Sequence, residues 1–155
     1  MKIKAIVFSL ALFFASAIVC SAQTSAHMGT WKLNEANSKF PKGATKNHTV
    51  VYEAAGDRTK VTVEGTDASG TAIHSEWTGK FDGKPYALTG DPAGDMRSYR
   101  VVNRRTLSLR STKAGKLTTT ATIVVSRDGK SRTVTASSKN AQGKWTTSTA
   151  GYDKQ

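Results

Sequence analysis

Apolar and polar residues alternate along most of the chain from residue 48 onward, with the spacing of two that is typical of β-strands with one buried face. The longest alternating segment, Thr71 to Phe81, places Ile73 and Trp77 on the same face. Turn-forming pairs such as Asp82-Gly83 separate the segments. The pattern predicts an all-β domain, a single antiparallel meander of about eight to ten short strands that closes as a barrel or folds as a sandwich.

The two ends of the meander are also visible in the sequence. Gly29 to Leu33 is the first segment expected to form a strand, and Trp145 to Tyr152 is the last. Between the first strand and His48, the segment Asn34 to Asn47 holds one large apolar residue, Phe40, beside turn-forming residues, so we expect a loop or short cap there. No segment after the leader has the periodicity of an α-helix.

Several strand faces expected to point inward are rich in small and hydroxyl-bearing residues, as in Trp145 to Tyr152. A dry core requires larger apolar side chains to reach the usual packing density, so these residues indicate a partly hydrated interior. The alternative is that the threonines point outward, where β-branched residues are common on exposed sheet surfaces. Both interpretations remain open from the sequence.

The first 22 residues have the order of a secretory signal peptide: Lys2 and Lys4, an apolar segment from Ala5 to Val19, and small residues up to Ala22. Residues 23–155 then form one domain in the periplasm or outside the cell. Attachment of lipid to Cys20 is the alternative, although Val19 stands where lipoprotein processing prefers a small residue. Cleavage after Ala22 would leave a mature chain without cysteine, which excludes disulfides and thiol chemistry.

The chain is strongly basic, with a formal net charge of +12 that falls to +10 when the two leader lysines are removed. Such a charge favours acidic partners, for example anionic lipid headgroups, wall polymers or nucleic acid. An extracytoplasmic location argues against nucleic acid. The simpler alternative is that scattered Lys and Arg residues only keep the protein soluble.

Gly29-Thr30-Trp31-Lys32-Leu33 resembles the Gly-x-Trp strand that begins lipocalins and fatty-acid-binding proteins, the calycin group of ligand-carrying β-barrels. The chain is similar to small secreted lipocalin-like proteins of bacteria. The resemblance implies a calycin-type barrel in which Trp31 packs across the closed end as a structural plug. The C-terminal triplet Ala150-Gly151-Tyr152 lacks the arginine with which fatty-acid-binding proteins clamp a carboxylate, so fatty-acid specificity is not implied.

If the barrel encloses a small apolar or amphipathic molecule, its wall needs broad apolar side chains with polar tips. Trp77, Tyr99 and Tyr152 are the candidates, and ordinary core packing is the alternative for each. Arg97 and Arg100 flank Tyr99 and could meet an anionic headgroup, but residues an odd number apart cannot share a strand face. Arg100 is therefore a candidate lining residue if Tyr99 points outward, and a surface residue otherwise.

Catalytic and metal motifs do not emerge from the sequence. The three histidines are isolated, apart from His74 and Glu76 on one predicted strand face, and no Gly-x-Ser-x-Gly elbow is present. We therefore expect a non-enzymatic protein without a cofactor or metal that binds a small hydrophobic or amphipathic ligand. The alternative is a basic cell-envelope module that binds anionic lipid or wall polymer on its exterior and holds no internal ligand.

Overall fold

The computed structural model describes residues 24–140 and 142–155, and the predicted leader and Cys20 lie outside them. The described chain consists of one short 3-10 helix and ten strands. In chain order these are η1 (Ser25–His27), β1 (Gly29–Lys39), β2 (Lys46–Ala55), β3 (Arg58–Thr66), β4 (Ala72–Gly79), β5 (Tyr86–Thr89), β6 (Met96–Asn103), β7 (Thr106–Lys113), β8 (Lys116–Val125), β9 (Ser131–Lys139) and β10 (Trp145–Lys154).

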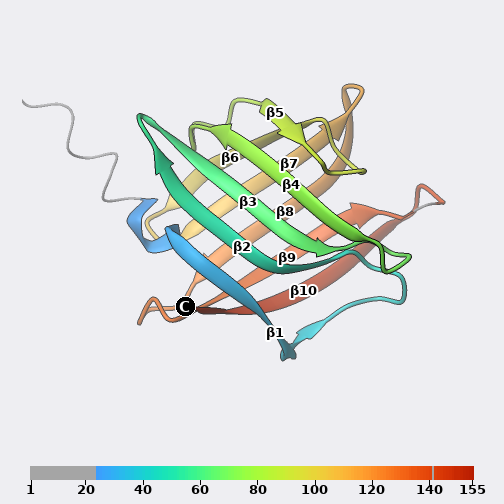
Figure 1. Ribbon diagram of the computed structural model, residues 1–155, viewed down its shortest axis with the longest axis horizontal. Coiled ribbons are helices and arrows are strands. Elements are labelled where there is room, and N and C mark those ends of the chain that lie inside the picture. Colours follow the sequence, from blue (N-terminus) through green and yellow to red (C-terminus); the bar gives the residue numbers. More distant parts are fainter. Residues whose placement is uncertain (1–23, 141) are drawn as a thin grey trace, which may run out of the picture.

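The strands form a closed antiparallel barrel (Figure 1). Each strand pairs with its neighbours in sequence, and β1 pairs with β10, with Trp31 opposite Lys154 and Leu33 opposite Tyr152. Closure gives every strand two partners, so the sheet has no free edge that could pair with another chain. The predicted all-β meander is confirmed, and the sandwich alternative is excluded.

The prediction of a loop or short cap from Asn34 to Asn47 is confirmed only for residues 40–45, because β1 continues to Lys39 and β2 begins at Lys46. Its pairing with β10 shifts register between Asn34 and Lys39, and the Ser38 hydroxyl bridges the shift by accepting from the Gly151 amide and donating to the Asn34 carbonyl. A Cβ on Gly151 would lie 2.8 Å from the Asn37 carbonyl oxygen, so only glycine allows this close approach. The second half of β1 could not be recognised from its polar sequence, because its irregular pairing with β10 depends on the Ser38 side chain.

The core follows the predicted alternation. Side chains such as Val61, Leu107 and Val125 are at most 1% exposed, whereas their neighbours in sequence point outward. A contiguous aromatic cluster forms part of the core, with Trp77 and Tyr99 in edge contact at 4.7 Å between ring centroids. The other rings in this cluster are Tyr52, Phe81 and Tyr86.

The hydroxyl-bearing residues lie on the outer face of some strands and on the inner face of others. Thr122 lies on the outer face, because its neighbours Ala121 and Ile123 are buried, and Thr135 pairs with Thr122 on the same face. In β10 the inner face carries Ser148 together with the buried Ala150 and Tyr152, and Ser148 is half-buried. Outward threonines therefore dominate β8 and β9, while β10 contributes small residues to the interior.

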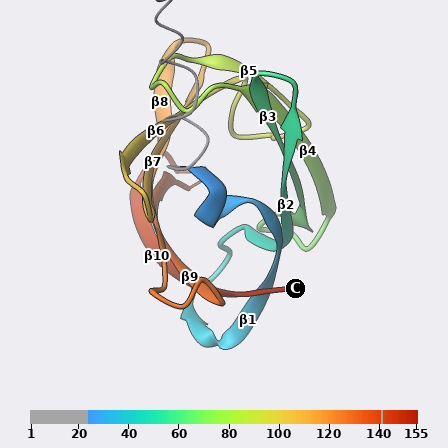
Figure 2. The ribbon, with the colours of Figure 1, turned by 90° about the vertical axis from the view of Figure 1, so that its left-hand side faces the viewer.

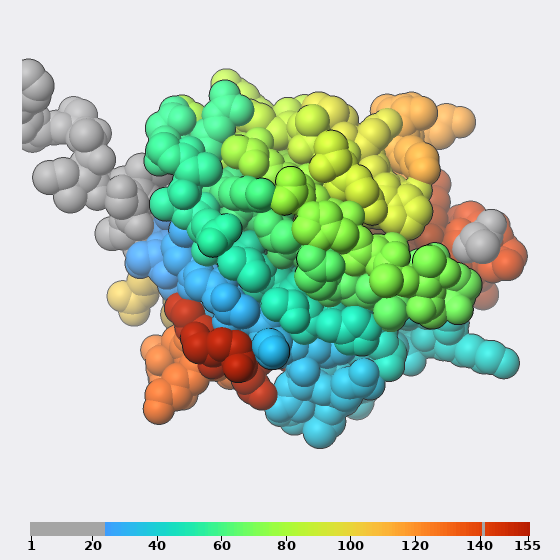
Figure 3. Space-filling view, in the orientation of Figure 1, coloured from blue at the N-terminus to red at the C-terminus, as the bar shows by residue number. Residues whose placement is uncertain are grey.

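The two ends of the barrel differ. At the end that contains Trp31, hereafter the Trp31 end, η1 lies within the ring of strands (Figure 2). At the other end, hereafter the Asp91 end, the β5–β6 loop is fastened to the wall by Asp91, which pairs with Arg97. Along the wall, side chains of β2, β3 and β4 form a continuous surface in the view of Figure 3.

Replacing Val125 by alanine should lower the free energy of unfolding by about 2 kcal/mol, because two buried methyl groups are lost and a cavity remains. Val124, its neighbour, is 42% exposed, and its replacement by alanine should change the same quantity by less than about 0.5 kcal/mol. Urea unfolding followed by tryptophan fluorescence measures both. Equal losses in the two variants would contradict the assignment of the inner and outer faces.

Candidate functional site

A groove of about 580 Å³ lies on the outer face of β6, β7, β8 and β9. Nearly all of its side chains are hydroxyls or guanidinium groups, and none of them is acidic. We call this the outer groove, and its lining residues are Gly83, Ser98, Arg100, Ser108, Leu109, Arg110, Thr120, Ala121, Thr122, Thr135 and Ser137.

Strand register places these side chains together. Tyr99, Leu109 and Ala121 face the core and are cross-strand neighbours, so the residues on either side of each point outward. The result is two parallel rows across four strands, each containing one arginine and three hydroxyls. The first row is Arg100, Ser108, Thr122 and Thr135, and the second is Ser98, Arg110, Thr120 and Ser137.

The rows continue onto β10. Thr149 pairs with Thr135 and Thr147 with Ser137, where the two hydroxyl oxygens are 3.0 Å apart. The hydroxyl surface is therefore a band that crosses five neighbouring strands, longer than the hollowed part alone.

The charge of the outer groove is not neutralised by the protein. Arg100 and Arg110 are exposed, and neither forms an ion pair with a residue in the described part of the chain. The nearby Asp82, which bridges to Arg100 through the backbone, accepts hydrogen bonds from the Tyr86 hydroxyl and the Lys84 amide. Guanidinium groups match the planar geometry of carboxylate and phosphate, and hydroxyls both donate and accept, so this surface suits an anionic, oxygen-rich ligand.

The predicted interior ligand residues divide into three places. Trp77 and Tyr99 lie in contact in the aromatic cluster, each at most 2% exposed. The Trp77 indole nitrogen donates to the Arg97 carbonyl at 2.8 Å, and burial raises the pKa of the Tyr99 phenol, which keeps it neutral. Arg100 lies on the opposite face of β6, in the outer groove. Tyr152 belongs to neither group.

Tyr152 and Trp31 meet at the Trp31 end around a buried arginine that sequence reasoning missed. The guanidinium carbon of Arg132 lies 4.8 Å from the ring centroid of Trp31, 4.8 Å from that of Tyr152 and 5.1 Å from that of Tyr52. Burial raises the pKa of Tyr152 to about 12 although the nearby Arg132 charge opposes the rise. The signal was present in the alternation, because Arg132 is two positions before the inward residue Val134.

Trp31 itself is fully buried, and its indole nitrogen donates to the His27 carbonyl of η1 at 2.9 Å. This bond attaches η1 to the inside of the barrel. Above η1, a second open hollow of about 490 Å³ lies at the Trp31 end. Its lining is Ser25, Ala26, Arg104, Arg105 and Arg127.

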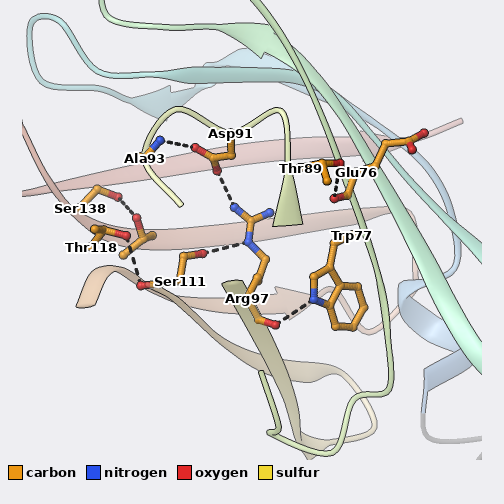
Figure 4. A network of polar contacts seen from close by, with 10 residues as sticks. Glu76, Trp77, Thr89, Asp91, Ala93, Arg97, Ser111, Thr118 and Ser138 are labelled. Carbon is orange, nitrogen blue, oxygen red and sulfur yellow. Dashed lines mark hydrogen bonds and ion pairs between the residues drawn. The ribbon is translucent and has the colours of Figure 1, made fainter. Parts of the chain in front are cut away.

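A second buried arginine, Arg97, holds the Asp91 end together (Figure 4). Its Nη2 donates to Asp91 Oδ2 and its Nε donates to the Ser111 hydroxyl, both at 2.9 Å. Asp91 also accepts from the Ala93 amide at 2.8 Å. The β5–β6 loop is therefore anchored by a charge pair inside the wall, and Arg97 is engaged in structure.

His74 and Glu76, which the sequence placed on one strand face, lie together with a second glutamate, Glu64. His74 Nδ1 lies 2.5 Å from Glu64 Oε1, and its Nε2 lies 3.6 Å from Glu76 Oε1. These contacts with carboxylates raise the pKa of the exposed His74. Within residues 24–140 and 142–155, no group of three His, Cys, Asp or Glu side chains is arranged to hold a metal ion.

Neither protein-family models nor curated proteins provide a match for this chain. Among the described residues, no helix is long and apolar enough to cross a membrane. The geometry described above therefore carries the functional argument.

His27 should make the protein lose stability in acid. Burial, followed by the charges of Arg132 and Lys154, lowers the pKa of His27 from 6.5 to about 4. As the pH falls from 6.5 to 4, the unfolded chain gains a proton that the folded chain does not, so the free energy of unfolding should fall by up to about 3 kcal/mol. Urea unfolding at a series of pH values measures this loss.

The His27→Gln variant should show a flatter pH dependence over the same range. The His74→Gln variant replaces an exposed histidine instead and should retain the acid loss. An unchanged slope in the His27→Gln variant would show that His27 does not remain neutral in the folded protein.

Proposed function

We propose that the protein is an extracytoplasmic interaction module with a lipocalin-like barrel, and that its outer groove binds an anionic, hydroxyl-bearing polymer of the cell envelope. One observation carries the proposal: two exposed arginines, neither with an ion-pair partner among the described residues, stand in rows of Ser and Thr hydroxyls, in an open groove without a carboxylate in its lining. Nucleic acid and catalysis have no part in it.

The two guanidinium groups of the outer groove favour a negatively charged ligand. Arg100 lies diagonal to Arg110 on the neighbouring strand, since Arg100 pairs with Ser108 and Arg110 with Ser98. Two such groups can each bind a phosphate or carboxylate of the same ligand through paired hydrogen bonds. The net charge of the chain adds a long-range attraction for polyanions that salt weakens.

The two rows of hydroxyl groups in the outer groove favour an extended ligand. Neighbouring strands lie about 4.8 Å apart, so hydroxyls repeat at that interval along each row. A chain of sugar or polyol units can place successive oxygens along such a ladder, from Arg100 across to Thr149. A single small anion would use only one end of it.

The lining disfavours an acyl chain. The large apolar residues that the described chain exposes, Val102, Val124 and Trp145, are all absent from the lining of the outer groove. Its two apolar lining residues, Leu109 and Ala121, turn their side chains to the core. Hydrogen bonds and charge therefore provide the attraction.

The double variant Arg100→Gln/Arg110→Gln should bind a polyanionic glycan at least tenfold more weakly than the native protein, because two charge-assisted contacts are lost. The matched control Arg104→Gln/Arg127→Gln removes the same charge from exposed positions at the Trp31 end and should lose much less. Calorimetric titration with a sulfated and a carboxylated polysaccharide, at low and physiological salt, measures both. Uncharged dextran is the negative control.

If the two double variants lost equal affinity for the polysaccharide, binding would depend only on the net charge of the protein, and the proposed site would be overturned. Binding to vesicles that contain anionic lipid, but not to either polysaccharide, would shift the ligand from a polymer to lipid headgroups.

Carriage of a small amphipathic molecule inside the barrel is the second candidate. It is supported by inward hydroxyls that remain half-buried on β8, β9 and β10, among them Thr119 and Ser138, whose side-chain oxygens are 3.1 Å apart. Native mass spectrometry of protein purified from its own host should then show a chain with bound mass. A chain that is always free of bound mass counts against carriage and leaves the outer groove unaffected.

A further inference from the structure

Arg132 is a buried positive charge for which the fold supplies no negative partner. It is 3% exposed, and it forms no ion pair with any described residue. Three aromatic rings surround its guanidinium group at about 5 Å, from Trp31, Tyr52 and Tyr152. Ring faces attract a cation, but they do not replace the hydrogen-bond acceptors that its N–H groups require.

Two of its nitrogen atoms remain without an acceptor. The buried Nε and Nη1 atoms of Arg132 have no hydrogen-bond partner among the described residues. Arg97, the other buried arginine, shows what this fold does when it compensates such a group: Nε bonds to Ser111 and Nη2 to Asp91. The difference between the two sites points to an acceptor that the chain itself does not provide.

His27 adds a third unpaired donor beside Arg132. Its side chain is completely buried, and neither ring nitrogen has a hydrogen-bond partner in the part of the chain that the structure describes. Burial, followed by the charges of Arg132 and Lys154, lowers the pKa of His27 to about 4, so the ring is neutral at pH 7 and carries one N–H. The position of the ring is fixed from η1, whose His27 carbonyl accepts from the Trp31 indole.

The approach to this end of the barrel is also positive. The hollow above η1 is lined by Arg104, Arg105 and Arg127, all on the turns that surround the Trp31 end. Clustered charges of one sign raise the local concentration of ions of the opposite sign. Anions are therefore concentrated at the end of the barrel that contains Arg132.

We propose that the Trp31 end binds one small monovalent anion between Arg132 and His27. The guanidinium is buried among three aromatic rings, so the class is limited to compact, weakly hydrated anions such as chloride, nitrate or formate. The anion accepts from the Arg132 Nε and Nη1 groups and from the His27 ring, and it neutralises the buried charge. This site is separate from the outer groove and does not depend on its function.

The most direct probe is the NMR signal of the Arg132 Nε–H group in the full mature chain, titrated with sodium nitrate, sodium chloride and sodium formate at constant ionic strength. Sodium sulfate supplies the balance of the ionic strength, because its larger, doubly charged anion does not fit. The Arg132 Nε–H and His27 ring signals should shift together and saturate with one dissociation constant. The Nε–H signal of the exposed Arg58 should not saturate.

Thermal unfolding gives a second readout. Nitrate should raise the unfolding midpoint of the native protein in a saturable way, by several degrees once its concentration is far above the dissociation constant. Arg132→Met keeps an apolar side chain between the rings and should remove the saturable rise. Arg58→Met, which removes an exposed charge, should preserve it.

Arg132 and His27 signals that do not respond to nitrate, chloride or formate would overturn the proposal, and would assign the unpaired donors to water. The same conclusion would follow if the Arg132→Met variant kept the full nitrate response. If that variant does not fold, the titration of the native protein decides the question alone.

Discussion

The pairing of β1 with β10 is the constraint on which the rest of this structure depends. It closes the sheet, so every strand has two hydrogen-bonded neighbours and every side chain is assigned to the inside or the outside. A slip of one residue in β4 would turn Trp77 outward, and a slip of one residue in β8 would bring Thr120 and Thr122 into the core. Closure therefore fixes both the aromatic interior and the polar rows that form the outer groove.

The interior shows two solutions to the burial of an arginine. Arg97 has a carboxylate and a hydroxyl, and it ties the β5–β6 loop to the wall. Arg132 has three aromatic rings and no carboxylate, next to a neutral histidine. A buried charge without a partner is costly, and only one of the two arginines, Arg97, has a carboxylate partner among the described residues. The Asp91 end is satisfied by its own residues, and the Trp31 end requires an acceptor from outside.

The alternation of residue types predicted the fold, because a period of two and short turns leave few arrangements for a chain of this length. It could not predict that β1 runs to Lys39, where a serine hydroxyl takes the place of a backbone partner. The alternation also left open which of Arg97 and Arg100 faces inward. Once Tyr99 is known to be buried, Arg97, two positions away, must face inward and Arg100, the next residue, must face outward. The inward or outward direction of each residue is not enough to predict the outer groove. Its two rows can be recognised only when the register of four neighbouring strands is known.

Binding on the outside of the barrel is the central claim, and backbone amide NMR with a soluble polyanionic glycan tests it most directly. The account predicts shift changes at outward residues of β6 to β9, with Arg100 and Arg110 at their centre. Changes confined to Trp77, Tyr99 and the other inner residues would contradict it and place the ligand inside the barrel.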